Sequence, residues 1–215
     1  MQPIRSHREG TPARPARSGG VDPRAPDAPV YPPREDTRLL LPFAEVPRGT
    51  RLLEVGTGSG LAALAAARRG ARVVATDLNP HALRRLRARA REEGVDLALV
   101  RTDLAHGLGR FDRILANPPY LPTRPEERDP DRWHNLALDG GPDGCRVTAR
   151  LVDELDQHLA RGGGAFVVVS SRQDADALAR IRNGWEIRGG TLEVVDSRPL
   201  EGERLDVWRL TLATD

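Results

Sequence analysis

Cysteine is almost absent from this chain, which has a single one, Cys145, among 215 residues. One cysteine cannot form an internal disulfide or a metal site, so we expect a small buried residue in a cytoplasmic protein. Long apolar runs are also missing, and the N-terminus lacks the apolar core of a secretion signal, so we expect no membrane association. The five histidines show no metal-ligand spacing, and we predict no metal site.

Lysine is entirely absent, and aromatic residues make up only 4% of the chain. The 33 basic residues are therefore all arginine, and against 31 acidic residues they leave a net charge of +2. Five arginines between positions 84 and 91 alternate with apolar residues at helical spacing, which indicates the solvated face of a helix. Nucleic-acid binding by this stripe stays open as an alternative, although few rings are available to stack on bases.

The chain divides into a leader and one domain. Residues 1–28 are rich in Arg, Pro, Gly and Ala and contain no aromatic residue, so we expect a disordered leader. We predict a single domain over residues 29–213, because a chain of this length with 39% hydrophobic content can bury a substantial core. Its proline-rich stretch 29–48 precedes the first strand, and the polar loop 121–144 is too long for a simple connection.

Strands and helices alternate along the domain, which predicts an α/β fold with a mostly parallel, seven-stranded sheet, helices on both faces and a C-terminal antiparallel hairpin. We expect strands at 51–55, 72–76, 95–101, 111–116, 165–170, 191–197 and 204–212. We expect helices at 59–69, 80–93, 146–160 and 173–182. Asn79 should cap the second helix with Pro80 at its first position, and residues 199–202 should form the hairpin turn.

A glycine-rich turn follows the first predicted strand. Gly56, Gly58 and Gly60 let the backbone turn sharply and approach a ligand closely. Their G-x-G-x-G spacing differs from the G-x-G-x-x-G of dinucleotide enzymes. The next strand ends in Asp77, 21 residues beyond Gly56, where a ribose diol is gripped in this topology. A simple turn and a helix-capping Asp are the alternatives, but the combination favours an adenosyl ligand.

The segment Asn117-Pro118-Pro119-Tyr120 directly follows the apolar run 111–116. A planar amide or base amine is a poor nucleophile, because its lone pair is conjugated. Two acceptors aimed at its N–H bonds weaken that conjugation, and the Asn117 side-chain carbonyl and the Pro118 backbone carbonyl are candidates in a turn that the prolines hold rigid. Tyr120 can stack on the planar group. The alternative is a stiff turn that only closes the strand.

Four polar or glycine positions follow the carboxyl ends of strands: Gly56, Asp77, Asp103 and Asn117. In an open parallel sheet these ends form one rim where ligands bind, so we expect the four to lie together. For Asp103, a loop carboxylate facing water is the alternative. In the long loop, Trp133 and His134 could touch a substrate, but Trp133 could equally anchor the loop to the core.

Five motifs in this order resemble the class I S-adenosylmethionine-dependent methyltransferases, and within them the short branch of the HemK/PrmC glutamine methyltransferases. They are L-E-V-G-T-G-S-G at 53–60, A-T-D-L-N-P at 75–80, T-D-L at 102–104, N-P-P-Y at 117–120 and A-L-D-G-G-P-D-G at 137–144. The segment 30–37, V-Y-P-P-R-E-D-T, is also similar to the short branch. The resemblance covers about residues 29–212 and implies a Rossmann-like methyltransferase domain.

The resemblance implies S-adenosylmethionine as cofactor, with residues 29–48 as a lid over it and residues 121–144 as a loop on the acceptor side. The implied catalytic residues are Asn117, Pro118 and Tyr120. The implied cofactor contacts come from five segments: Glu35, Asp36 and Thr37 as closure; Glu54, Gly56, Thr57, Gly58 and Gly60 at the methionine part; Asp77 and Leu78 at the ribose; Asp103 and Leu104 at the adenine; and Asn117. A helix cap made by Asp36 or Thr37 is compatible with their role.

The resemblance further implies methylation of a glutamine in a protein substrate, a peptide chain release factor with a Gly-Gly-Gln loop. A small activating partner protein could add to the strand 95–101, although a strand simply packed by a helix is the commoner arrangement. Three alternatives stay open: a methyltransferase of nucleic-acid adenine or guanine amines, a small-molecule methyltransferase, and a cofactor-binding module without catalysis.

Overall fold

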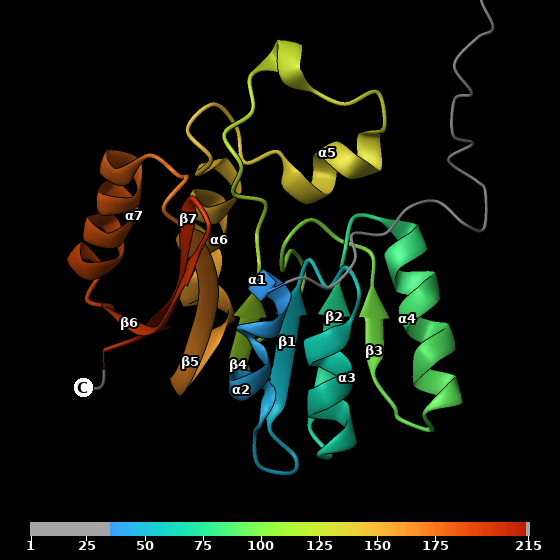
Figure 1. Ribbon diagram of the computed structural model, residues 1–215. Helices are drawn as coiled ribbons and strands as arrows, with labels where there is room; N and C mark the ends of the chain where they lie inside the picture. The colour runs from blue at the N-terminus through green and yellow to red at the C-terminus, as the bar shows by residue number, and fades with distance from the viewer. Residues whose placement is uncertain (1–34, 214–215) are drawn as a thin grey trace, which may run out of the picture.

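A computed structural model describes residues 35–213 and shows a seven-stranded sheet in the order β3-β2-β1-β4-β5-β7-β6 (Figure 1). The first five strands in this order are parallel, whereas β7 runs antiparallel between β5 and β6. This confirms the predicted sheet with its C-terminal hairpin. The strands are β1 (Arg51–Val55), β2 (Arg72–Thr76), β3 (Ala98–Val100), β4 (Phe111–Ala116), β5 (Leu159–Ser170), β6 (Thr191–Leu200) and β7 (Glu203–Thr211).

Helices lie on both faces of the sheet, as predicted; in Figure 1, α2 and α3 are in front of it and α6 is behind. Asn79 caps α4 by accepting a hydrogen bond from the His81 N–H, and Pro80 takes the first helical position. Within the described range, no helix combines the length and the apolar character that crossing a membrane requires. The helices are α1 (Glu35–Arg38), α2 (Leu41–Ala44), α3 (Leu61–Arg68), α4 (Pro80–Glu92), α5 (Arg132–Leu138), α6 (Arg146–His158) and α7 (Ala175–Ile187), with a 3-10 turn η1 (Pro125–Glu127).

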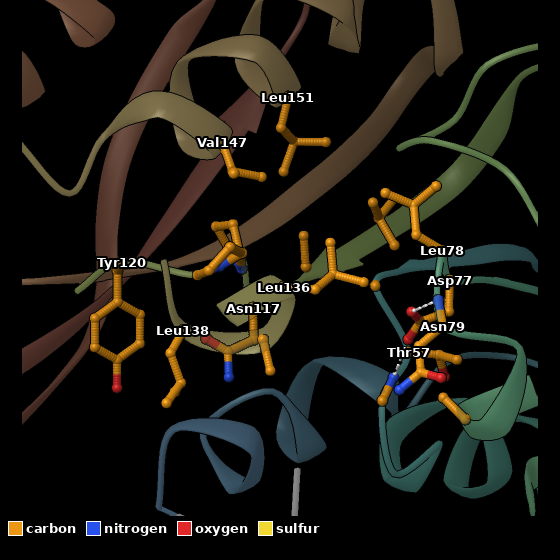
Figure 2. A pocket seen from close by; sticks show the side chains of 18 of the residues that line it. Thr57, Asp77, Leu78, Asn79, Asn117, Tyr120, Leu136, Leu138, Val147 and Leu151 are labelled. Carbon is orange, nitrogen blue, oxygen red and sulfur yellow. Dashed lines mark hydrogen bonds between the residues drawn. The ribbon is translucent and has the colours of Figure 1, made fainter. Parts of the chain in front are cut away.

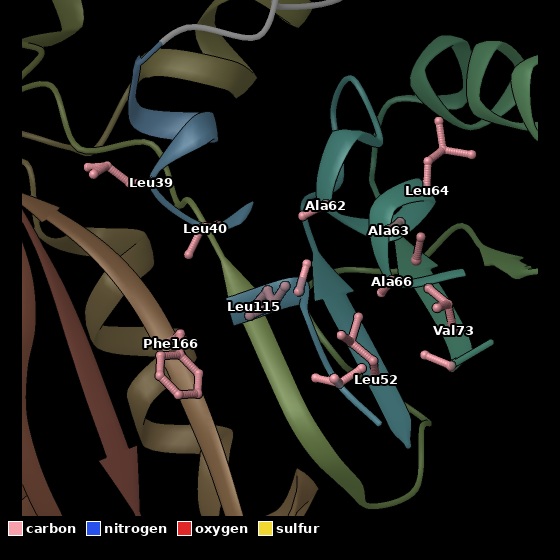
Figure 3. Packing of buried hydrophobic residues seen from close by; sticks show 14 of the residues in the cluster. Leu39, Leu40, Leu52, Ala62, Ala63, Leu64, Ala66, Val73, Leu115 and Phe166 are labelled. Atoms are coloured by element: carbon pink, nitrogen blue, oxygen red, sulfur yellow. The ribbon is translucent and has the colours of Figure 1, made fainter. Parts of the chain in front are cut away.

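The sheet separates two apolar clusters, because successive side chains of a strand point to opposite faces. In β1, Leu52 packs with α2 and α3 while Leu53 packs with α6 and α7. In β4, Leu115 likewise packs in the first cluster and Ile114 in the second. Figure 3 shows the first cluster, with Leu52 and Leu115 beneath the small alanines of α3. Both faces of the central strands are therefore buried, which holds their carboxyl ends in fixed positions.

The strand predicted at 95–101 is only three residues long, and this prediction was wrong in extent. Gly94 has a φ of +65°, and the Val95 N–H donates to the Ala90 carbonyl, so this stretch closes the end of α4 instead of pairing. Only Ala98–Val100 then pairs with β2, at the edge of the sheet.

Three C-terminal elements, β5, α7 and β6, are longer than predicted, whereas α6 ends at His158, two residues before the predicted end. The strand expected from residue 165 begins at Leu159, because glycines 162–164 lie within the strand at a register irregularity opposite β4. The helix expected at 173–182 continues to Ile187, since Trp185 near its end is buried in the second cluster. The hairpin turn is shorter than the predicted 199–202, because Leu200 already pairs with Glu203.

The loop 121–144 is not a structureless connection, because it contains η1 and α5. Asp131 caps α5 by accepting from the Trp133 N–H, a local signal that the polar composition of the loop hid. Two further boundaries differ: the predicted helix 59–69 is shorter at both ends, and Asp36 and Thr37 lie inside α1 without capping it. The leader 1–28, and residues 29–34 of the predicted lid, lie outside the described residues.

Candidate functional site

A cavity of about 740 Å³ opens at the carboxyl ends of the parallel strands, in the size range of small-molecule sites. Figure 2 shows Asp77, Leu78 and Asn79 on one side of it and Asn117 and Tyr120 on the other. The rim predicted from the sequence thus exists. The predicted site residues that line the cavity are Asp36, Thr37, Glu54, Gly56, Thr57, Gly58, Asp77, Leu78, Asp103, Leu104, Asn117, Pro118 and Tyr120.

The glycine turn and Asp77 form one hydrogen-bonded unit. All three glycines have positive φ, which only glycine adopts without strain. The Asp77 carboxylate accepts from the Gly58 N–H at 2.9 Å and from the Asn79 N–H at 2.7 Å. Burial raises the pKa of Asp77, and these two hydrogen bonds oppose the rise. Asp77 therefore joins the ends of β1 and β2 and stands in the cavity wall.

Glu54 is a buried carboxyl group beneath the same turn. It accepts from the Thr57 hydroxyl at 2.5 Å and from the Ala63 N–H at 3.0 Å, so it connects the turn to the start of α3. Burial raises its pKa from 4.5 to about 7, against the lowering effect of both hydrogen bonds. Glu54 therefore holds its proton more tightly in the folded protein than a solvent-exposed carboxyl group does.

The end of β3 contributes Asp103 and Leu104 to the cavity. Asp103 forms an ion pair with Arg150 of α6 at 2.7 Å, and its side chain is 46% exposed. Leu104 is the one non-glycine residue in the described range with a positive φ, at +49°, and its carbonyl accepts from the Thr76 hydroxyl. Such strained backbone is typical of ligand sites, where surrounding contacts hold it in place.

The Asn117 turn presents an unused hydrogen-bond acceptor. The Asn117 Oδ1 atom is buried without a hydrogen-bond partner in the described part of the chain. The Tyr120 hydroxyl donates to Asp36 Oδ2 at 3.3 Å, which links this turn to α1. A buried carbonyl oxygen without a donor is costly, which makes this atom a candidate acceptor for an N–H group of a ligand.

The loop 121–144 covers the cavity as a lid, and in Figure 1 its helix α5 lies beyond the carboxyl ends of the strands. Its two ends are joined by hydrogen bonds between Leu121 and the backbone of Leu138 and Gly140. Asp139 is buried and accepts from Arg128 and from the Gly141 N–H, and it also pairs with Arg146. These contacts give the lid a defined shape.

Trp133 is 6% exposed, as expected of a residue that anchors the loop, and it also lines the cavity. His134 lines the cavity as well but is exposed. The sequence analysis missed Ser59, although this residue lies within the glycine turn. It also missed the apolar wall of the cavity, which the helical spacing of apolar residues in α5 and α6 could have revealed. That wall consists of Leu136, Leu138, Val147 and Leu151.

Two predicted cofactor contacts, Glu35 and Gly60, do not line the cavity. Glu35 pairs instead with Arg198 of β6 at 2.7 Å and with Arg38. Gly60 is the N-cap of α3, and a Cβ atom there would lie 2.3 Å from the Leu86 side chain of α4, so a glycine is needed there for helix packing.

Residues 52–129 match the family model of a methyltransferase domain. A putative protein N5-glutamine methyltransferase of Methanocaldococcus jannaschii is 39% identical over 144 residues, which cover 66% of this chain and 73% of that protein. This chain belongs to the HemK/PrmC family of class I methyltransferases. The release factor glutamine methyltransferase of Deinococcus radiodurans is 41% identical over 74% of this chain, which spans only 62% of that relative's length.

Among solved structures, the Mtq2–Trm112 complex of E. cuniculi, responsible for methylation of the eRF1 translation termination factor, contains a chain with the same fold. The two chains superpose with a TM-score of 0.65 at 26% identity, over 86% of this chain and 99% of that one. The Rossmann-like methyltransferase fold predicted from the motifs is therefore confirmed.

Proposed function

We propose that this protein transfers a methyl group from S-adenosylmethionine to the side-chain amide of a glutamine in a protein substrate, such as a peptide chain release factor. One observation supports this above the others: the cavity holds Asp77 and the unpartnered Asn117 Oδ1 at two ends of a single space. The relatives named for glutamine methylation support the choice of acceptor.

The donor end of the cavity fits an adenosylated amino acid. Asp77 supplies a carboxylate for ribose hydroxyls, and the glycine turn leaves room for close backbone approach. The Ser59 hydroxyl is another buried polar atom without a partner in the described residues, and it lines the same space. When bound, the donor supplies a sulfonium methyl group. Residues 29–48 are proposed to close over it, and Asp36, Thr37 and Leu40 of this segment line the cavity.

The acceptor end is built for a planar NH2 group. Asn117 Oδ1 and the Pro118 carbonyl are proposed to accept from the two N–H bonds, while Tyr120 packs on the plane of the amide. These contacts align the nitrogen with the methyl group, and alignment alone can lower a barrier by roughly 7–11 kcal/mol.

The proton balance requires no strong base. The C–N bond forms as the S–CH3 bond breaks, and the methylated nitrogen then releases a proton to solvent. The products are S-adenosylhomocysteine and N5-methylglutamine. A dedicated His or Lys beside Asn117 is therefore unnecessary.

The partner and the compartment are part of the same proposal. The similar chain comes from a complex with a second protein. In this chain β3 is a sheet edge of three residues, which a small activating partner is proposed to extend by strand addition. A methyltransferase of release factors acts where translation takes place, so we propose a cytoplasmic location.

The test is a transfer assay with a methyl-labelled donor. Purified release factor, the same factor with its loop glutamine replaced by alanine, transfer RNA and duplex DNA are offered separately. We expect label only on the intact factor, and mass spectrometry should place one methyl group on the glutamine. Label on nucleic acid alone would exclude the glutamine assignment and favour an amino-methyltransferase of bases.

A further inference from the structure

Trp133 lines the cavity and carries one polar group, its indole N–H. Its Nε1 atom is buried and has no hydrogen-bond acceptor within residues 35–213. A buried N–H without an acceptor costs about 1–3 kcal/mol, so native proteins rarely leave one unless a ligand or water completes it. Ser59 Oγ and Asn117 Oδ1 share this state in the same cavity wall.

Contacts of the ring place Trp133 at the donor end. Its ring meets the His81 ring edge-on, with centroids 5.7 Å apart. His81 lies in the first turn of α4, four residues after Asp77, and Asn79 and Ala82 beside it also line the cavity. The guanidinium of Arg132 lies 4.1 Å from the centre of the indole. The side chain is thus held over the end of β2.

The acceptor end lies elsewhere along the rim. Asn117 follows β4, and in the sheet β1 separates β4 from β2. Two strand spacings amount to about 10 Å, so a group held over the end of β2 is remote from the amide at Asn117. The lid therefore reaches across the cavity, although the sequence predicted it for the acceptor side only.

We infer that Trp133 is a binding residue for the nucleoside of the methyl donor, to which its indole N–H donates a hydrogen bond. This inference rests on the proposed function. The N1, N3 and N7 atoms of adenine and the ribose oxygens can accept hydrogen bonds, so the nucleoside supplies the acceptor that the N–H lacks in the described part of the protein. The lid helix α5 then closes over the donor as well as over the acceptor.

The test is Trp133→Phe, which removes the indole N–H and keeps an aromatic ring. Calorimetry measures the Kd of S-adenosylhomocysteine and of 5′-methylthioadenosine, which lacks the amino-acid part. We expect the variant to bind both ligands about three- to tenfold more weakly, the loss that one hydrogen bond accounts for. The matched control is Trp185→Phe. The indole N–H of Trp185 already donates to the Thr191 carbonyl, and Trp185 is buried in the second apolar cluster, away from the cavity wall. Its affinities should stay within about twofold of wild type.

Unchanged affinity of Trp133→Phe for both ligands would overturn the inference, and would mean that a trapped water satisfies the N–H. A loss confined to S-adenosylhomocysteine would overturn it too, because Trp133 would then contact the amino-acid part. A higher KM for the release factor at unchanged donor affinity would likewise overturn the inference. If wild-type protein bound neither ligand, the proposed donor site itself would be refuted, which is a separate result.

Discussion

Asn117 carries the largest share of the proposed chemistry, so a substitution that removes its side-chain amide tests that chemistry directly. In Asn117→Ala the amide loses an acceptor at the reacting nitrogen, so we expect the methyl-transfer rate to fall by about a hundredfold or more. Donor affinity should fall far less than the rate, because Asp77 and the glycine turn, which make most of the proposed donor contacts, are untouched. Steady-state transfer assays and calorimetry with S-adenosylhomocysteine measure the two effects.

The matched control is Asn183→Ala, which removes an exposed amide on α7. Its rate should equal that of wild type. Full activity in Asn117→Ala would show that the turn is only structural, as in a binding module without catalysis.

Glu54 makes the stability of the free protein depend on pH. Its pKa in the folded protein is raised to about 7 from 4.5, so the folded chain holds this proton more tightly than the unfolded chain does. The stabilisation is therefore complete below pH 4.5 and is lost as the pH rises through about 7. Between pH 5.5 and 8.5, the free energy of unfolding should fall by about 2 kcal/mol more in the wild type than in Glu54→Gln.

Urea unfolding of both proteins at the two pH values measures this difference. Asp77 also has a raised pKa, but it is present in both proteins and its contribution largely cancels. If the free energy of unfolding changed with pH equally in wild type and variant, the raised pKa of Glu54 would be contradicted.

The lid and the Asn117 turn meet at Gly144, so a change in one element should disturb the other. Gly144 has a φ of +73°, and a Cβ atom there would lie 2.5 Å from the Tyr120 carbonyl oxygen. Gly144→Ala should therefore displace the turn, destabilise the protein by about 1–3 kcal/mol and lower activity. Denaturant unfolding and the transfer assay measure both effects.

Gly162→Ala is the matched control, since Gly162 has a φ of +75° with no atom within 4 Å of the added Cβ. It carries the same backbone strain, about 1 kcal/mol, without the clash. Equal losses in the two variants would mean that the lid and the turn are not coupled through this contact.

The donor site draws on β1, β2 and the lid at once, so binding should stabilise the molecule as a whole. At 100 times its Kd, S-adenosylhomocysteine should add about 2.7 kcal/mol to the free energy of unfolding. For a chain of this size that raises Tm by about 5–10 °C. Asp77→Ala should reduce the shift strongly in a thermal scan at the same ligand concentration. A shift that survives this change would remove the ribose role of Asp77.

Much of the arrangement followed from local patterns in the chain. The positive φ of Gly56, Gly58 and Gly60, the cap at Asn79 and the alternation of strands each depend on residues close in sequence. Since parallel strands end at a common edge, these local signals also predicted that Asp77 and Asn117 would share a rim. The ion pair of Glu35 with Arg198 could not be predicted, because the two residues lie far apart in the chain.

The lid was decided only by tertiary structure. No local pattern joins Trp133 to His81, or Asp139 to Arg128 and Arg146, because these contacts form only when the loop folds back over the finished sheet. The unpartnered Trp133 N–H likewise becomes visible only once its surroundings are known. Short-range propensity therefore determined the sheet and its rim, whereas packing across the rim decided what covers the cavity and which atoms remain free to bind.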